Sequence, residues 1–101
     1  MKLKKIGIIG CGAMGSEISE YILKNLGDRS KIVAICDIDS KKVKALYARI
    51  KPKPIITTID GLINKSDLII EAASVEVSGL IAEKADSLKK DALIMSTGGL
   101  L

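Results

Sequence analysis

The chain has 101 residues, enough for one domain with a modest core, and 48% of them are hydrophobic although Trp and Phe are absent, so the core must be aliphatic. The formal net charge is +4, with basic residues spread along the chain rather than gathered in a stripe with stacking aromatic rings, which argues against nucleic-acid binding. No apolar run approaches the ~20 residues of a membrane span, and the basic start lacks a signal-peptide cleavage site.

Short aliphatic runs alternate with amphipathic stretches along the whole sequence. In chain order we expect strands over residues 3–10, 31–37, 55–57, 68–71 and 92–95, and helices over residues 13–26, 41–50, 60–64 and 75–89. Strands that alternate with helices predict an α/β fold with a Rossmann-type, doubly wound parallel sheet of five strands in the order 3-2-1-4-5. The ligand crevice is then expected where the first and fourth strands part.

Caps and apolar spacing support the first two predicted helices. An acidic or hydroxyl residue before the second helix, Asp39 or Ser40, is expected to cap its amino end. Gly27 is expected to cap the carboxyl end of the first helix. The predicted inward-facing residues of the first helix are Ile18, Tyr21, Ile22 and Leu26.

A glycine-rich turn follows the first predicted strand and opens the first predicted helix. Its G-x-G-x-x-G spacing permits a sharp turn, a close approach of pyrophosphate to the backbone, and tight packing of helix on strand. The free N–H groups and positive dipole end of the helix then face the phosphates. The turn is therefore predicted to bind a dinucleotide, with a purely structural glycine turn as the alternative. The expected cofactor-binding residues here are Gly10, Cys11, Gly12, Ala13, Met14 and Gly15.

An acidic residue at the end of the second predicted strand completes the dinucleotide fingerprint. Asp37 lies about 20 residues after the glycine motif and is expected, with Ile38 beside it, to hold the adenosine ribose. Its carboxylate would repel a 2′-phosphate by roughly a few kcal/mol at ~4 Å, so NAD is favoured over NADP. NADP stays open because Lys41 and Lys42 would reach a phosphate if Asp37 turned away. A helix-capping role is the alternative for Asp37, and Asp39 competes for either role.

Small and polar residues follow the fourth and fifth predicted strands, at the edge where the nicotinamide end of the cofactor is expected. Ala73 leaves room for the ring, and Ser74 and Thr97 are candidate hydrogen-bond donors to the cofactor or to a substrate carboxylate. The alternative for both is a polar strand-end residue satisfied by its own backbone. Glu71 is expected to be a strand-end polar residue rather than a general base.

Cys11 and Cys36 are the only cysteines, and both are expected near the carboxyl ends of neighbouring strands. Two cysteines do not make a disulfide framework, so a cytoplasmic compartment is expected. A helix amino terminus can lower the pKa of a thiol such as that of Cys11. Because the sequence has no histidine to act as a base, we expect no catalytic thiol, and no metal site is predicted.

Taken together, residues 10–15, Asp37, residues 71–74 and residues 96–98 resemble the amino-terminal domain of the L-aspartate dehydrogenase family. Looser relatives are the homoserine-dehydrogenase-like and other two-domain dehydrogenases. Many enzymes share the glycine motif, whereas the two strand-end motifs are more specific, and the resemblance covers the whole chain. It implies NAD(P) binding at Gly10, Gly12, Ala13, Met14, Asp37, Ala73 and Ser74.

The resemblance also implies that cofactor binding and catalysis are carried out by different domains. Members of that family continue into a second domain with a catalytic histidine, substrate-binding residues and much of the dimer interface. Residues 1–101 are then one dinucleotide-binding domain without its catalytic domain, and the apolar end at residues 100–101 favours truncation. The parent reaction would move hydride between nicotinamide C4 and the α-carbon of an amino or imino acid. The chain alone is expected to be inactive and, with apolar surface exposed, to form a homodimer.

A second class of function remains open from the sequence. The chain would in that case be a stand-alone NAD(H)-binding or sensing module that acts through a partner protein. A purely structural domain with a degenerate motif predicts no ligand at all, and the intact three-glycine spacing argues against it.

Overall fold

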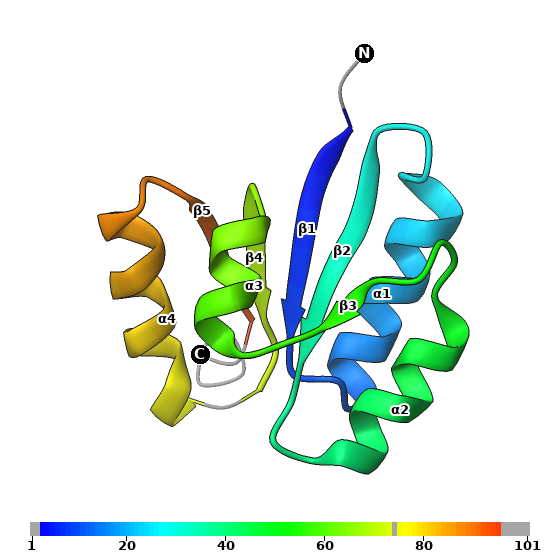
Figure 1. The fold of residues 1–101 in the computed structure, drawn as a ribbon, viewed down its shortest axis with the longest axis horizontal. Coiled ribbons are helices and arrows are strands. Elements are labelled where there is room, and N and C mark those ends of the chain that lie inside the picture. The colour runs from blue at the N-terminus through cyan, green and yellow to red at the C-terminus, as the bar shows by residue number, and fades with distance from the viewer. Residues whose placement is uncertain (1–2, 74, 96–101) are drawn as a thin grey trace.

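The fold is a parallel sheet with helices on both faces, seen in a computed structural model that describes residues 3–73 and 75–95 (Figure 1). The strands are β1 (Lys4–Ile9), β2 (Ser30–Cys36), β3 (Ile55–Ile56), β4 (Leu68–Glu71) and β5 (Asp91–Ile94). The helices are α1 (Ala13–Asn25), α2 (Ser40–Arg49), α3 (Ile59–Lys65) and α4 (Val75–Ser87).

The sheet has the order β3-β2-β1-β4-β5, and every neighbouring pair of strands is parallel. The predicted Rossmann-type fold and its strand order are therefore confirmed. From β1 the chain winds outward to β2 and β3, then returns to the other side of β1 for β4 and β5. The order thus reverses between β1 and β4, and in open α/β sheets the carboxyl edge at such a point is where ligands bind.

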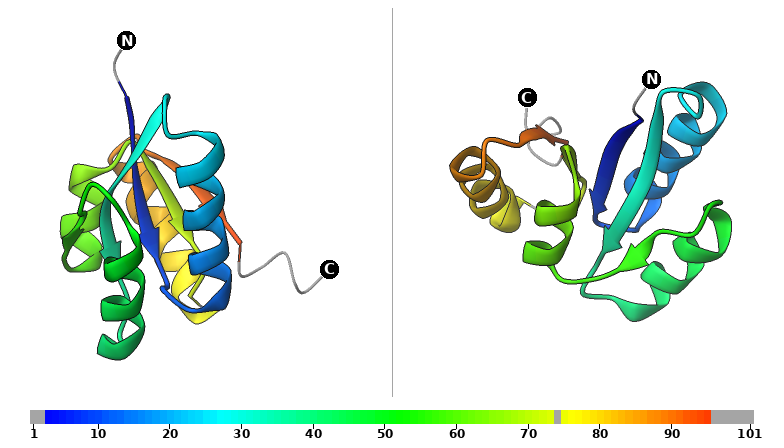
Figure 2. Two further views of the ribbon diagram at one scale, coloured as in Figure 1. Left: turned by 90° about the vertical axis from the view of Figure 1, so that its right-hand side faces the viewer. Right: turned by 45° about the horizontal axis from the view of Figure 1, so that its top comes forward.

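Two aliphatic clusters, one on each face of the sheet, hold the helices in place. Strand residues such as Ile8 and Ile35 pack with Ile22 of α1 and Leu46 of α2 on one face. On the other face, Ile9, Ala34 and Ile69 pack with α3 and α4 through Leu62, Ile63, Ile81 and Ala85. Figures 1 and 2 show the resulting arrangement, with α1 and α2 beside β1–β3 and with α3 and α4 toward β4 and β5. The near-continuous apolar strands follow from this burial on both faces.

Within the described residues, each predicted helix and strand is present, with ends that match the predictions to within two residues. The largest difference lies at the end of α4, which stops at Ser87 rather than at residue 89. Lys89 has a left-handed φ of 56°, and the Lys90 and Lys89 N–H groups donate to the Ala85 and Asp86 carbonyls. This Schellman pattern ends the helix without the glycine that usually marks it.

The inward face of α1 differs from its prediction. Tyr21 was placed in the apolar stripe, but it is 61% exposed, so this prediction is wrong. The buried residues are Gly15, Ser19 and Ile22, and the Ser19 hydroxyl donates to the Gly15 carbonyl at 2.8 Å. The small residues Gly15 and Ser19 allow the helix to lie close to the sheet. The carboxyl cap of α1 is Leu26 rather than the expected Gly27.

Candidate functional site

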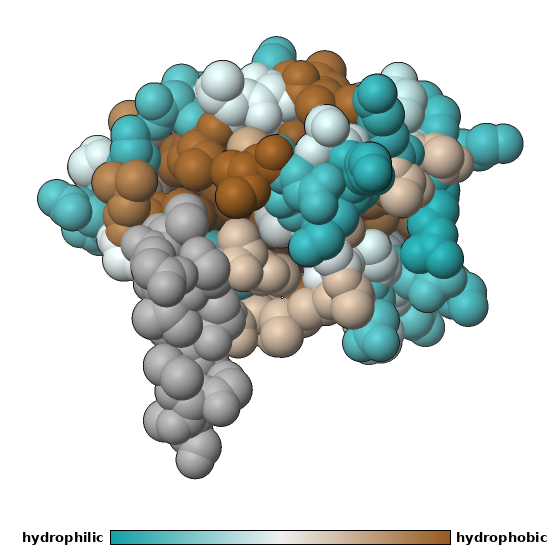
Figure 3. Space-filling model, turned by 90° about the horizontal axis from the view of Figure 1, so that it is seen from below, coloured by the Kyte–Doolittle hydropathy of each residue, from teal (hydrophilic) through white to brown (hydrophobic). Residues whose placement is uncertain are grey.

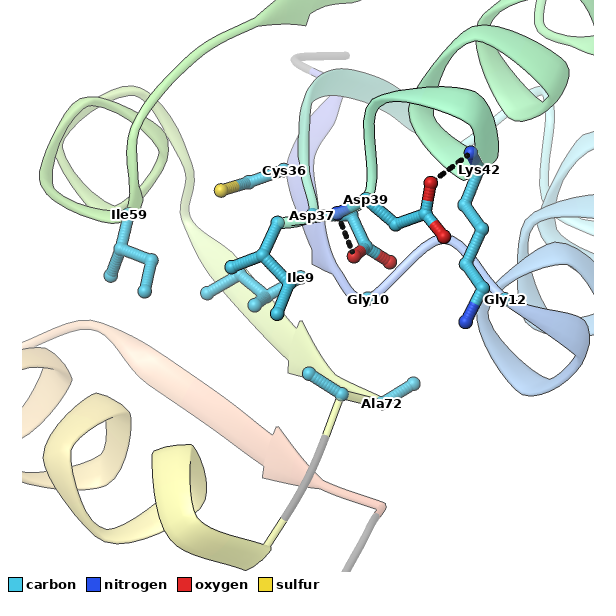
Figure 4. Close-up of a pocket in the computed structure, with 11 residues that line it drawn as sticks. Ile9, Gly10, Gly12, Cys36, Asp37, Asp39, Lys42, Ile59 and Ala72 are labelled. Carbon is cyan, nitrogen blue, oxygen red and sulfur yellow. Dashed lines mark hydrogen bonds between the residues drawn. The ribbon is translucent and has the colours of Figure 1, made fainter.

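A cavity of about 340 Å³ opens at the carboxyl edge of the sheet, where the strand order reverses. Five of the sequence-predicted residues line it, namely Gly10, Gly12, Asp37, Ile38 and Ala73. Figure 4 shows the glycine turn and the start of α2 on one side of this cavity, Ile59 on the other side, and Ala72 below Gly10. Viewed from this edge in Figure 3, apolar surface adjoins residues of intermediate hydropathy and a hydrophilic rim.

The glycine turn is shaped by close backbone approaches at two of its three glycines. Gly10 has a φ of +99°, and a Cβ there would lie 2.6 Å from the Ala72 carbonyl carbon and the Ala73 nitrogen. A Cβ on Gly15 would overlap the carbonyl oxygen of Gly10. Both positions therefore require glycine for the turn itself.

Gly12 differs from these two glycines because the space beside it is open. The nearest heavy atom to a Cβ built there is Lys42 Nζ, at 3.8 Å. Neither backbone strain nor packing thus demands glycine at this position, which has the ordinary φ of −78°. Open space at the second glycine is what a pyrophosphate needs in order to approach the backbone, so the turn fits a dinucleotide.

The amino end of α1 presents a positive pole to this space. Gly12 is the N-cap residue, and within the described residues no side chain caps the helix and no acidic residue lies in its first turn. The first N–H groups of a helix have no intrahelical partner, so these groups are suited to an anion. Ala13 and Met14 are exposed here, whereas the Cys11 side chain is buried and does not line the cavity.

Asp37 joins the end of β2 to the glycine turn. Its Oδ2 accepts a hydrogen bond from the Cys11 N–H at 2.7 Å, and its Oδ1 accepts one from the Asp39 N–H at 2.9 Å. A carboxylate offers about four acceptor positions, so ribose hydroxyls can still be accommodated. The N-cap of α2 is Asp39, whose carboxylate accepts from the Lys41 and Lys42 N–H groups, and this settles which acid caps the helix. Ile38 is fully exposed at the rim.

The end of β4 brings another carboxylate near the cavity but turns it inward. Glu71 is 0% exposed, and its Oε2 accepts from the Ala73 N–H at 2.7 Å. This carboxylate holds the loop that lines the cavity and has no access to solvent, as expected for a strand-end polar residue. Ser74 and Thr97 lie outside the described residues.

The two cysteines lie close together, as expected, with Cys11 Sγ donating to the Cys36 carbonyl at 3.6 Å. Burial raises the pKa of the Cys11 thiol to about 12, and the negative charges of Asp37 and of a Cys36 thiolate act in the same direction. Burial also raises the pKa of Cys36. The nearby helix terminus does not lower the pKa of Cys11, because the side chain is only 3% exposed and desolvation dominates.

Several residues that line the cavity were not predicted as site residues. Ile9, Cys36 and Ala72 lie at or just beyond the ends of β1, β2 and β4, and the parallel register would have indicated them. The sequence indicates Lys42 only as a possible contact to a 2′-phosphate, whereas the residue lines the cavity itself. Ile59 comes from the start of α3, and no local pattern marks it.

In the described part of the chain, no helix has the length and apolar character that crossing a membrane requires.

The fold and the open glycine turn define a dinucleotide-binding domain of the Rossmann type. The chain belongs to the family of homoserine dehydrogenase NAD-binding domains, whose model matches residues 10–101. This membership confirms NAD as the cofactor class that the sequence predicted.

Curated relatives point to one group of enzymes. The chain is 43% identical over 97 residues to L-aspartate dehydrogenase of Methanocaldococcus jannaschii. The aligned region covers 95% of this chain and 36% of that protein. It is 39% identical over 98 residues to L-aspartate dehydrogenase of Methanosarcina acetivorans, covering 95% of this chain and 35% of that protein. The chain thus spans about a third of the length of these relatives, and the predicted resemblance is confirmed.

Solved structures share the fold at low identity. An oxidoreductase from Thermotoga maritima superimposes with a TM-score of 0.81 at 20% identity, covering 92% of this chain and 29% of the other. Myo-inositol dehydrogenase from Lactobacillus casei, in complex with NAD(H) and myo-inositol, gives a TM-score of 0.80 at 22% identity, covering 92% and 28%. Both similarities concern the sheet and its helices.

Proposed function

We propose that the chain is the NAD-binding part of an L-aspartate-dehydrogenase-like oxidoreductase, in which hydride moves between nicotinamide C4 and the α-carbon of an amino or imino acid. The observation that carries this proposal is the open space beside Gly12, which a phosphate can enter. At Gly10 and Gly15 the corresponding space is occupied by backbone atoms. The identity to L-aspartate dehydrogenases over 95% of the chain supports the assignment to that group of enzymes.

Each part of the cavity has a proposed task in cofactor binding. The backbone of residues 10–15 would hold the diphosphate, Asp37 and Ile38 the adenosine ribose, and Ala73 with Ser74 and Thr97 the nicotinamide end. When bound, the nicotinamide supplies the carbon that accepts or gives up hydride. We propose NAD rather than NADP as the preferred form, because two backbone N–H groups hold the Asp37 carboxylate against turning away. NADP remains a second, weaker ligand.

The groups that carry out the chemistry are proposed to lie outside these residues. The sequence has no histidine, and Glu71, the carboxylate next to the expected nicotinamide end, is fully buried. The curated relatives are about three times as long, so a further domain or a partner is proposed to supply catalysis. Leu80 on α4, Leu88 just after α4 and Leu93 on β5 are each about half exposed, which supports a contact with another domain or a homodimer. A cytoplasmic location is proposed with this function.

A stand-alone NAD(H)-binding module that acts through a partner protein is the second candidate. The burial of Glu71 favours this candidate. Among the described residues around the cavity, none is placed as an exposed acid or base beside the expected nicotinamide end. The two candidates differ in whether a catalytic domain accompanies this one. Coupled turnover of L-aspartate after addition of the missing domain would favour the dehydrogenase.

Calorimetric titration of the chain with NAD, NADH and NADP tests the proposed function. We expect NAD to bind more tightly than NADP, and Asp37→Asn to weaken NAD by about tenfold because the amide accepts fewer hydrogen bonds from the ribose. Asp28→Asn, an exposed acid outside the cavity, is the matched control. We expect no turnover of L-aspartate by the chain alone. Absence of binding by any of the three dinucleotides would contradict the proposal.

A further inference from the structure

The side chain of Lys42, on α2, lines the cavity beside the glycine turn. Lys42 lies in the first turn of α2, where its N–H is 3.4 Å from Asp39 Oδ1. From there its stem runs toward Gly12, and Nζ and Cδ lie 3.8 and 3.9 Å from the position of a Cβ on Gly12 (Figure 4). The ammonium group therefore borders the open space that the second glycine leaves.

This ammonium group has no anionic partner in the described part of the chain. The ion pairs found there involve other lysines and an arginine, and neither Asp37 nor Asp39 pairs with Lys42 Nζ although both line the same cavity. The other positive group at this place is the uncapped amino end of α1, which begins directly after Gly12. Two positive groups thus border one open space, and a bound anion would be attracted by both.

We propose that Lys42 binds the diphosphate of the dinucleotide, as a second positive group beside the helix terminus. This inference rests on the proposed function, because it assigns a residue to the same site. The diphosphate is favoured over a ribose 2′-phosphate for two reasons. The ammonium group lies at Gly12, where the backbone is open to the pyrophosphate, and the ribose side of the cavity carries the carboxylates of Asp37 and Asp39.

The test is a set of calorimetric titrations of the 101-residue chain with NAD, NADP, ADP and adenosine. Lys42→Met keeps an extended side chain and removes the charge, so we expect NAD, NADP and ADP each to bind about tenfold more weakly, with adenosine unchanged. Lys41→Met makes the same exchange one residue earlier on α2, at a side chain that does not line the cavity. We expect it to change these affinities by about twofold or less. Lys42→Arg should retain most of the binding of NAD.

Three results would overturn the assignment. Unchanged affinity of Lys42→Met for ADP and NAD would show that the ammonium group does not contact the diphosphate. A loss confined to NADP would place it at the 2′-phosphate instead, and an equal loss in Lys41→Met would indicate only a general field effect. If the wild-type chain binds neither NAD nor ADP, the proposed function fails and this inference fails with it; binding by wild type separates the two.

Discussion

The exchange Gly12→Ala should separate cofactor binding from folding. A Cβ at this position meets no heavy atom closer than 3.8 Å, and the backbone angles of −78° and −156° suit any L-residue. The remaining effect on folding comes from the N-cap, where alanine is less favourable than glycine by about 0.5–1 kcal/mol. A domain of this size changes its Tm by about 4–8 °C per kcal/mol, so we expect a decrease of only a few degrees.

Binding of NAD should respond much more strongly to the same methyl group. The methyl would occupy the surface that the pyrophosphate approaches and would keep the phosphates from the first N–H groups of α1. Loss of one hydrogen bond to a charged group is worth about 1.5–3 kcal/mol, which is a roughly 10- to 100-fold increase in Kd. Calorimetric titration with NAD, together with thermal unfolding of the same samples, measures both effects.

Two further glycines provide controls for this experiment. Gly15→Ala should destabilise the fold as well as binding, because its Cβ would overlap the Gly10 carbonyl oxygen. Gly79→Ala, in α4, has nothing within 4 Å, so it should leave NAD affinity unchanged and stabilise the helix by about 0.5–1 kcal/mol. Wild-type affinity for NAD in Gly12→Ala would refute the placement of the diphosphate at this turn.

The remaining predictions concern Cys11 and Asp39. The pKa of the Cys11 thiol rises from 9.0 to about 12 on burial, so between these values the unfolded chain loses a proton that the folded chain keeps, and stability should fall as pH rises through this range. Urea unfolding at increasing pH measures this, Cys11→Ala should reduce the slope, and an identical slope would contradict the prediction. Asp39→Ala should lower stability by about 1 kcal/mol through loss of the α2 cap, whereas Asp39→Asn keeps an acceptor and should be nearly neutral; equal denaturation midpoints for both would argue against the cap.

The fold was predictable because its signals are local and agree with one another. Aliphatic runs of strand length, amphipathic stretches of helix length and a glycine turn between the first two each fix one element, and topology rules then leave few arrangements of a parallel sheet. The end of α4 at Ser87 was not predictable in this way, since Lys89 adopts the left-handed conformation that sequence reasoning assigns to glycine. The face of α1 that packs on the sheet is the one with Gly15, Ser19 and Ile22, and Tyr21 lies to one side of it, so its ring stays exposed.

The candidate site was predictable where it lies at the ends of the first, second and fourth strands. Gly10, Gly12 and Asp37 meet at one cavity because strands β1 and β2 are parallel neighbours. The contributions of Ile59 and Lys42 depend on how α3 and α2 cross the edge of the sheet, and a linear pattern does not contain this information. For Cys11, proximity to a helix terminus is a local signal, whereas the burial that raises its pKa depends on tertiary packing.

Two carboxylates at the carboxyl edge show how such residues can organise a site without reacting in it. Asp37 accepts N–H groups from the glycine turn and from the approach to α2, and Glu71 accepts the N–H of Ala73 in the loop after β4. Together they fix the segments on both sides of the point where the strand order reverses. An acid in such a sequence motif is therefore weak evidence for acid–base chemistry, because the open edge of a parallel sheet needs acceptors for the N–H groups of its loops. The hydrogen bonds of Asp37 and Glu71 thus hold backbone segments in position at this edge of the sheet.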